Sequence, residues 1–248
     1  MSICFSGRRA LILGGSCDLA ICLAHHLICK DVSPLLTYRT EKGENYIKKE
    51  LESVSGRYNT IYLNFGEIQS LKGLLDKIGS DDFDYMVDFA QGDYESLISA
   101  SDESRVYQYF SENISFRAAL LKNLTRIMLR KKKGRLIFIS SSAAKRPNPG
   151  QGFYAAAKLA SEALYRNLGL ELGSRGITTI TLRPGYIEEG RGKAFLKPNK
   201  EKVLNKIPIK RVITRKEVAE AIIFFLSENS RGFNATEIEL DGGFTAGK

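Results

Sequence analysis

Short apolar runs alternate with helical patterns along the whole chain. Seven runs are typical of buried strands: residues 9–13, 34–38, 60–65, 85–90, 134–140, 177–184 and 236–243. Between them, apolar positions recur at helical spacing in the segments 19–28, 40–54, 68–78, 120–128, 154–172 and 214–228. Strands that are apolar throughout and alternate with helices indicate a parallel sheet covered on both faces.

No repeat, linker or low-complexity run interrupts this alternation. We therefore predict one α/β domain over residues 1–248, with a doubly wound, seven-stranded parallel sheet. The segment between 185 and 213 is basic and irregular in pattern, and Thr214 with Glu217 three residues later predicts a capping box at the start of the last helix. Because ligands bind beyond the carboxyl ends of such strands, the residues that follow the strands are the candidates for function.

The composition of the 248 residues is that of an ordinary globular protein. No apolar run is long enough to span a bilayer, so we expect no membrane partner and a cytoplasmic location. The four cysteines and two histidines have no metal-ligand spacing, and we expect no metal site.

The net charge of +9 is concentrated in two segments. Arg117 to Arg135 contains eight basic residues and no acid, and Arg191 to Lys216 contains ten basic residues and one acid. These segments predict two basic surfaces, which are either solvated faces or docking surfaces for an anionic partner. No nucleic-acid module is readable, so we expect a small acidic protein or a phosphorylated carrier and no nucleic acid.

The residues that follow two of the predicted strands suggest a dinucleotide-binding site. The first strand ends in Gly14-Gly15 and a helix follows at once, which predicts either a tight turn or a seat for a pyrophosphate at a helix N-terminus. The second strand is followed by Arg39, which is either an ordinary surface arginine or a partner for the 2′-phosphate of NADPH.

Tyr154 and Lys158 stand four residues apart in a helical pattern, so their side chains share one face. The spacing alone fits an alanine-rich structural helix as well as a proton donor with its charge partner. Three consecutive serines, Ser140 to Ser142, end the fifth strand, and Ser141 lies thirteen residues before Tyr154.

Taken in order, "GRLIFISSSA", "YAAAK", "RPGYIEE" and "LDGGF" resemble the short-chain dehydrogenase/reductase family along nearly the whole chain. In "GQGFYAAAKLASEAL" and "LGSRGITTITLRPGYIE" the chain is similar to bacterial 3-oxoacyl-acyl-carrier-protein reductases. The resemblance implies a Rossmann-like fold with a cofactor half over about 1–150, a catalytic and substrate half over about 110–248, and a lid over about 189–207. It also implies NADPH-dependent reduction of a 3-ketoacyl group on an acyl carrier protein, in fatty-acid-like, polyene or polyketide synthesis, by a homo-oligomer (a tetramer or dimer).

The resemblance gives each catalytic position a role. Tyr154 would donate a proton to the ketone oxygen, and Lys158 would bring the tyrosine pKa towards neutrality and hold the ribose hydroxyls. Ser141, with Ser140 and Ser142 as competitors, would position the oxygen, and Asn113 would support a water that reprotonates Tyr154. The implied cofactor contacts are Gly14, Ser16, Asp18, Leu19, Arg39, Asn64, Phe65, Ala90, Tyr154, Lys158, Pro184, Gly185 and Ile187.

For the acyl carrier, the resemblance implies docking on Lys132 and Arg175 near the active-site mouth, with the lid lysines 193, 197 and 200 extending the patch.

Some positions depart from the family pattern. Asp18 and Ala20 stand where glycines are usual, and the carboxylate of Asp18 repels a pyrophosphate unless it points away or caps the helix. Phe89 stands where an asparagine is usual, and Glu189 where a threonine is frequent. Two other functions therefore stay open: a reductase of a small free ketone or sugar, and a family member that has lost catalysis and serves as a scaffold or binding subunit.

Overall fold

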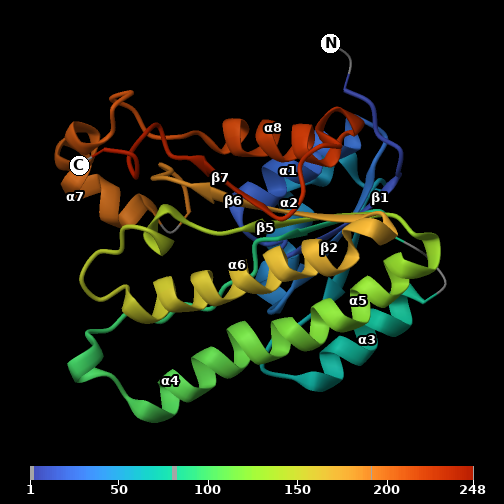
Figure 1. Ribbon diagram of the computed structural model, residues 1–248, viewed down its shortest axis with the longest axis horizontal. Helices are drawn as coiled ribbons and strands as arrows, with labels where there is room; N and C mark the ends of the chain where they lie inside the picture. The colour runs from blue at the N-terminus through green and yellow to red at the C-terminus, as the bar shows by residue number, and fades with distance from the viewer. Residues whose placement is uncertain (1–2, 80–82, 191, 248) are drawn as a thin grey trace.

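The computed structural model describes residues 3–79, 83–190 and 192–247. Seven strands form one parallel sheet in the order β3-β2-β1-β4-β5-β6-β7 (Figure 1), as the alternation predicted. The strands are β1 (Arg9–Leu13), β2 (Ser33–Tyr38), β3 (Asn59–Tyr62), β4 (Tyr85–Asp88), β5 (Gly134–Ile139), β6 (Ile177–Pro184) and β7 (Thr236–Leu240).

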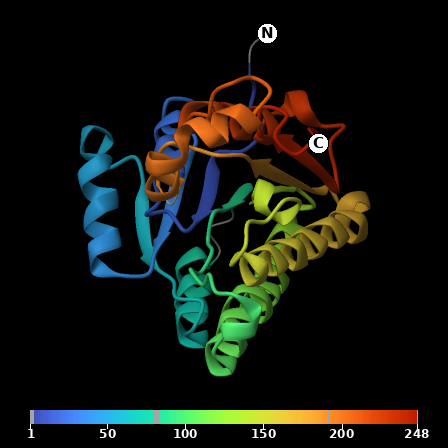
Figure 2. The same cartoon turned by 90° about the vertical axis from the view of Figure 1, so that its left-hand side faces the viewer.

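Helices cover both faces of the sheet, which Figure 2 shows from the carboxyl ends of the strands. One face is covered by α1 (Asp18–Ile28), α2 (Glu41–Glu50) and α8 (Arg215–Leu226). The other face is covered by α3 (Ile68–Ile78), α5 (Arg117–Lys131) and α6 (Gly152–Leu172). The two remaining helices are α4 (Glu103–Phe110), which leads into α5, and α7 (Gly192–Lys206), which lies beyond the carboxyl end of β6.

Two apolar cores result from the alternation of side chains along each strand. Ile12 and Val87 lie in the core under α1 and α8, whereas Leu11 and Met86, their neighbours in sequence, lie in the core under α3, α5 and α6. Both faces of the central strands β1, β4 and β5 are buried, so their sequences are mostly continuous apolar runs, whereas the edge strands β3 and β7 are only partly buried.

The basic segment between 185 and 213 is where the predicted secondary structure was wrong, because it contains helix α7. Lysines dominate its sequence, but Leu196, Val203 and Ile207 recur at helical spacing and are buried against Phe244. Pro198 lies inside the helix, where it removes one backbone donor. These three apolar residues are too few to be recognised as a helical stripe among the lysines of the sequence.

Other boundaries differ by a few residues. Four strands end before their predicted limits, β3 at Tyr62, β4 at Asp88, β5 at Ile139 and β7 at Leu240, because the residues that follow turn away at the carboxyl edge of the sheet. The predicted capping box is confirmed: Thr214 accepts from the amide of Glu217, whose carboxylate accepts from the amide of Thr214 at 2.9 Å.

The order of the strands reverses at β1, which lies between β2 and β4. The loops after β1 and β4 meet there: a Cβ added to Gly14, whose φ is +69°, would lie 2.8 Å from the amide nitrogen of Ala90. The position needs glycine both for this close approach and for its left-handed backbone. This edge of the sheet is where ligands bind in doubly wound folds.

Candidate active site

The turn after β1 is held by the neighbouring strand. The amide of Gly14 donates to the hydroxyl of Thr37 at 3.0 Å, and the amide of Gly15 donates to the carbonyl of Thr37 at 2.8 Å. Ser16 follows, and α1 begins at Asp18. The first amides of a helix have no partner within it, so Asp18 and Leu19 bring donors and a positive dipole end to the crevice.

The carboxylate of Asp18 is bound to α2. The hydroxyl of Tyr46 donates to its Oδ1 at 2.6 Å, and this hydrogen bond raises the pKa of Tyr46 to about 12. A Cβ added to Gly190 would lie 3.8 Å from Oδ2, so the loop after β6 also reaches this carboxylate. Tyr46 therefore fixes the negative charge that the turn carries in place of a glycine.

Arg39 is exposed at the carboxyl end of β2. The next residue, Thr40, caps α2 by accepting from the amide of Gly43 at 3.1 Å, which fixes the backbone that carries the arginine. In the part of the chain that the structure describes, the guanidinium of Arg39 forms no ion pair. Its donors face solvent beside the crevice.

The residues after β3 lie at the same carboxyl edge of the sheet as the turn after β1. The side chain of Asn64 closes its own turn, accepting from the amide of Gly66 at 3.1 Å and donating to Glu67 at 2.7 Å. The ring of Phe65 stacks on Phe116 with their centroids 4.8 Å apart. The backbone of Asn64 and Phe65, more than their side chains, is thus what a ligand would meet.

The loop after β6 completes the crevice. Pro184 ends β6, and the amide of Gly185 donates to Leu240 at 3.0 Å. A Cβ added to Gly185 would lie 2.8 Å from the Cα of Asp241, so the end of β7 presses on this loop. Ile187 pairs with Ile213 in an isolated bridge, and the carboxylate of Glu189 lies 3.7 Å from the Nε of Arg215.

The three serines after β5 have different surroundings. Ser140 is buried and its hydroxyl donates to the carboxylate of Glu162. Ser142 is also buried, whereas Ser141 is half-buried. The hydroxyl oxygen of Ser141 accepts from the amide of Ala143 at 3.1 Å, which orients it and leaves its own proton for a ligand. Accessibility thus favours the same serine as the spacing in the sequence.

Tyr154 lies in the first turn of α6 and is half-buried. Lys158, one turn later, is buried, and its ammonium donates to the carbonyl of Ile139 at 2.7 Å. The same ammonium lies 4.8 Å from the ring centroid of Phe138 and 5.7 Å from that of Tyr154. The lysine therefore connects α6 to the end of β5, directly before Ser140 and Ser141.

Asn113 lies in a π-helical segment, Ser111–Phe116, between α4 and α5. Its side chain is buried and bonded at both polar atoms: Oδ1 accepts from the amide of Gly92 at 2.8 Å, and Nδ2 donates to the carbonyl of Tyr109 at 2.8 Å. The main-chain carbonyl is the group that this residue can offer to a site. Single π-helical turns inside α-helices are frequent at functional sites.

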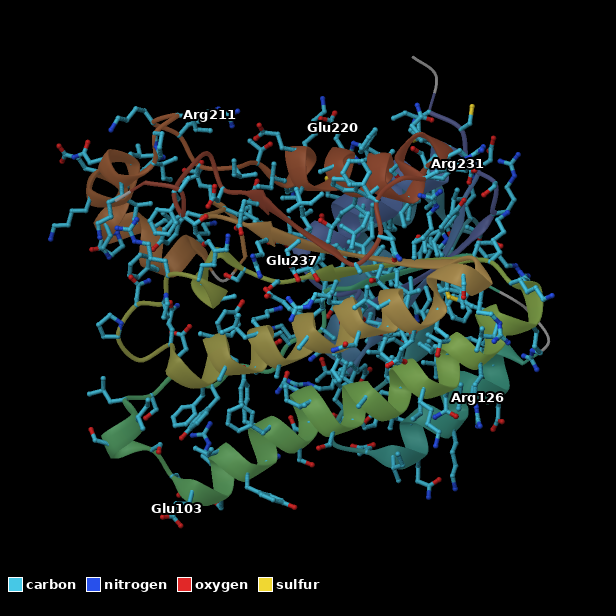
Figure 3. The ribbon with its side chains drawn as sticks, in the orientation of Figure 1. Glu103, Arg126, Arg211, Glu220, Arg231 and Glu237 are labelled. Atoms are coloured by element: carbon cyan, nitrogen blue, oxygen red, sulfur yellow. The ribbon has the colours of Figure 1, made fainter. Side chains whose placement is uncertain are left out.

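Two buried ion pairs lie beneath these groups, and the sequence analysis did not identify them. Arg117 donates through Nε to Asp88 at 2.8 Å, with both side chains fully buried. Arg183 donates through Nε to Glu162 at 2.8 Å, and this hydrogen bond raises the pKa of Arg183. The prediction that Arg117 belongs to a basic surface was therefore wrong for this residue; Arg126, on the outer side of α5, is exposed (Figure 3).

Lys132 and Arg175 lie together, but away from the site of their own chain. Lys132 follows α5 and Arg175 precedes β6, so both are at the amino ends of the strands. Ser141 and Pro184 are at the opposite edge, about 20 Å away along a six-residue strand such as β5. The expectation that these two residues flank the mouth is not met within one chain; α7 lies at that edge instead.

No helix in the described residues is long and apolar enough to cross a membrane. Within the same residues, no cluster of three or more histidine, cysteine, aspartate or glutamate side chains could hold a metal ion.

Comparison with known proteins identifies the family. A family model described as enoyl-(acyl carrier protein) reductase matches residues 18–245. The 3-oxoacyl-(acyl-carrier-protein) reductase of Haemophilus influenzae is 27% identical over 239 residues, which cover 96% of this chain and 98% of that protein. The enzyme of the same name from Escherichia coli is 27% identical over 241 residues, with 96% and 98% covered.

The fold is shared with solved structures of low sequence identity. A gluconate 5-dehydrogenase from Burkholderia cenocepacia, in complex with NADP and tartrate, superposes with a TM-score of 0.89 at 21% identity, covering 99% of this chain and 98% of that one. A short-chain dehydrogenase/reductase family protein superposes with a TM-score of 0.85, also at 21% identity, with 98% and 99% covered. With the family model spanning residues 18–245, these matches show that the chain belongs to the short-chain dehydrogenase/reductase family and is an oxidoreductase.

Proposed function

We propose that this protein reduces the ketone of a 3-ketoacyl group carried on an acyl carrier protein, with NADPH as the hydride donor, in fatty-acid-like, polyene or polyketide synthesis. The observation that carries the proposal is the arrangement of Ser141, Tyr154 and Lys158 at the carboxyl end of β5. The similarity to 3-oxoacyl-(acyl-carrier-protein) reductases over nearly the full chain supports the substrate class.

The chemistry follows from the charges at this point of the fold. A nicotinamide cofactor, when bound, would supply a hydride to the ketone carbon, so that negative charge would develop on the oxygen. Ser141 donates a hydrogen bond to that oxygen, and Tyr154 gives it a proton. The ammonium of Lys158, 5.7 Å from the ring centroid of Tyr154, stabilises the tyrosinate that forms. Tyr154 then recovers its proton from solvent through a water at the carbonyl of Asn113.

The family model and the curated relatives point to different bonds, since one is described as an enoyl reductase and the others reduce a 3-oxo group. A polar pair formed by Ser141 and Tyr154 suits a ketone oxygen, which becomes a hydroxyl. Hydride addition to an enoyl thioester instead builds charge on the thioester oxygen as an enolate, and the proton ends on the α-carbon without a hydroxyl being formed. Because the curated relatives match nearly the full chain, we favour the ketone, and an enoyl thioester is the substrate that tests the other reaction.

The residues at the crevice fit a dinucleotide phosphate. The N-terminus of α1 offers amide donors, and the carboxylate of Asp18 is held by Tyr46 on the α2 side. Glu189 is paired with Arg215, so its charge is partly offset. The exposed guanidinium of Arg39 suits the 2′-phosphate that distinguishes NADPH from NADH.

Replacing Arg39 with alanine should weaken NADPH binding about 10- to 100-fold, because a charge-assisted hydrogen bond is lost. NADH binding should stay almost unchanged, since it has no phosphate at this position. Titration of the cofactor fluorescence measures both constants. Lys42→Ala, at an exposed lysine in the first turn of the adjoining helix α2, is the matched control. An equal loss for both cofactors would mean that Arg39 acts structurally.

For the carrier, two basic surfaces are candidates. Lys193, Lys197 and Lys200 are exposed on α7, and Lys200 forms an ion pair of 2.7 Å with Glu188. These lysines belong to the proposed lid, over about 189–207, and they can receive an acidic carrier at the mouth of their own chain. Lys132 and Arg175 can serve a mouth only if it belongs to a neighbouring subunit.

The proposal includes such a neighbouring subunit, because it holds that the protein is a homo-oligomer, either a tetramer or a dimer. The helix that carries Tyr154 exposes two large apolar side chains on one face: Leu159 and Leu170 are 46% and 68% exposed, with Ala163 and Arg166 between them. Exposed leucines on such a face favour association between copies. Sedimentation at micromolar concentration measures the state directly.

Charge reversal separates the two surfaces. We expect Lys193→Glu with Lys197→Glu to raise KM for a carrier-bound 3-ketoacyl substrate, and to leave the same acyl group on a small thiol unaffected. Lys132→Glu with Arg175→Glu should do the same if the protein is an oligomer. Lys72→Glu, on the distant helix α3, is the control.

The same assay decides among the alternatives. Equal effects on carrier-bound and small substrates would contradict carrier docking and favour a reductase of a small free ketone or sugar. Reduction of the enoyl but not the ketoacyl thioester would overturn the proposed bond. NADPH binding without turnover of any of these substrates would favour the scaffold reading.

A further inference from the structure

The buried guanidinium of Arg117 joins the three elements that carry the proposed site. It donates to the carboxylate of Asp88 at the end of β4 and to the carbonyl of Ala90 in the following loop. It also donates to the carbonyl of Asn113 in the π-helical segment and to the hydroxyl of Ser161 on α6, the latter at 3.0 Å. A planar fork with five donors is suited to so many acceptors, whereas a lysine is not.

The charge of this arginine is matched locally. The carboxylate of Asp88 accepts from the amide of Ala90 at 2.9 Å, from Arg117 at 2.8 Å and from the hydroxyl of Tyr165 at 2.9 Å. Its lone pairs are therefore used by three elements of the fold. Because both charges are fully buried, each needs the other, and the pair behaves as one unit.

The contact with Asn113 links the ion pair to the proposed proton route. The side chain of Asn113 is bonded to Gly92 in the loop after β4 and to Tyr109 on α4, so we assign its main-chain carbonyl to the proposed proton route. A carbonyl oxygen has two lone pairs, and Arg117 takes one of them. The other lone pair is then held in a fixed direction for a water.

We propose that Arg117, charge-balanced by Asp88, is a positioning residue that fixes the Asn113 carbonyl for the return of the proton to Tyr154. This inference rests on the proposed function. It adds to the four positions that the family resemblance implies, because it assigns a part of the proton route to a buried ion pair. The inference concerns position only, and the hydride step is unchanged by it.

The test needs a variant that removes the contacts and keeps the fold. Arg117→Met alone leaves Asp88 buried without a counter-charge, and we expect the Tm to fall by roughly 10 °C. Asp88→Asn with Arg117→Met removes both charges, and an asparagine can still accept from Ala90. We expect this double variant to regain most of the lost Tm.

In the double variant, kcat for ketone reduction should fall roughly 10- to 100-fold, the effect of a misplaced catalytic group. The dissociation constant of NADPH should change less than twofold, and the solvent isotope effect on kcat should rise because proton return becomes slower. Arg135→Met is the matched control: this arginine is half-buried on β5 at the opposite edge of the sheet, where it donates to Ser230 at 2.8 Å. It should leave kcat and the isotope effect unchanged.

One measurement needs no substrate and separates this inference from the proposed function. Hydrogen exchange of the peptide covering residues 111–116 should be faster in the double variant than in the wild type, and unchanged in Arg135→Met. Unchanged exchange in the double variant, an unaltered kcat, or an equal loss of kcat and NADPH affinity would each overturn the positioning role. Absence of ketone reduction in the wild type would contradict the proposed function, and the exchange measurement would still test Arg117.

Discussion

Replacing Tyr154 with phenylalanine should lower kcat for the proposed ketone reduction about 100- to 10,000-fold, because the proposed proton donor to the developing alkoxide is removed while the ring remains. The fold should be unaffected, since the residue is half-buried in the first turn of α6. Steady-state NADPH oxidation with a 3-ketoacyl thioester measures the effect.

The control for this prediction is Tyr107→Phe, because Tyr107 lies on α4 with 80% of its surface exposed. That variant should keep the wild-type kcat. NADPH binding should be retained in both variants. If Tyr154→Phe turns over the substrate at near the wild-type rate, the assignment of the active site is wrong.

The second large effect concerns stability. Arg183→Met should lower the free energy of unfolding by about 3–5 kcal/mol, because the buried carboxylate of Glu162 loses its counter-charge. Glu239 also loses a contact of 2.8 Å, although Lys145 still lies 2.6 Å from it. Urea unfolding monitored by circular dichroism measures the change.

The chain offers a matched exposed pair for comparison. Arg166 on α6 lies 3.3 Å from Glu237 on β7, and about half of its side chain is exposed (Glu237 is labelled in Figure 3). Arg166→Met should cost less than about 1 kcal/mol, since surface pairs are screened by solvent. Combining Glu162→Gln with Arg183→Met should recover much of the loss. A loss in Arg183→Met no larger than that in Arg166→Met would show that the pair contributes little.

The sheet was predictable from the sequence because its strands are buried on both faces. A run such as Leu11–Leu13 has no polar position to confuse with a loop, and the order of strands and helices then restricts the topology. The helix over 192–206 was missed for the opposite reason. Its buried face consists of few residues among many lysines, and Phe244, which completes the small core, comes from the far end of the sequence.

The candidate site was partly predictable in the same way. Ser141, Tyr154 and Lys158 follow or face the end of one strand, so their spacing carries information about their proximity. Sequence spacing did not show that Arg117 is buried, because a run of basic residues is typical of an exposed surface. One signal was present: Arg117 lies three and four positions before Leu120 and Leu121, on the buried stripe of α5. A charge on such a stripe indicates a buried partner, and Asp88 at the end of β4 was the acid available.

The contacts between the end of β7 and the loop after β6 mean that this side of the site is completed late in synthesis. Gly185 bonds to Leu240 and packs on Asp241, and Phe244 fills the core beneath α7. The wall of the crevice and its basic helix therefore depend on residues 236–244, which leave the ribosome after every other element of the site. During synthesis, β1 to β5 and the helix with Tyr154 and Lys158 precede the segment that holds the loop after β6 in place. A chain that lacks residues 236–244 would carry Tyr154 and Lys158 without the contacts that fix this loop.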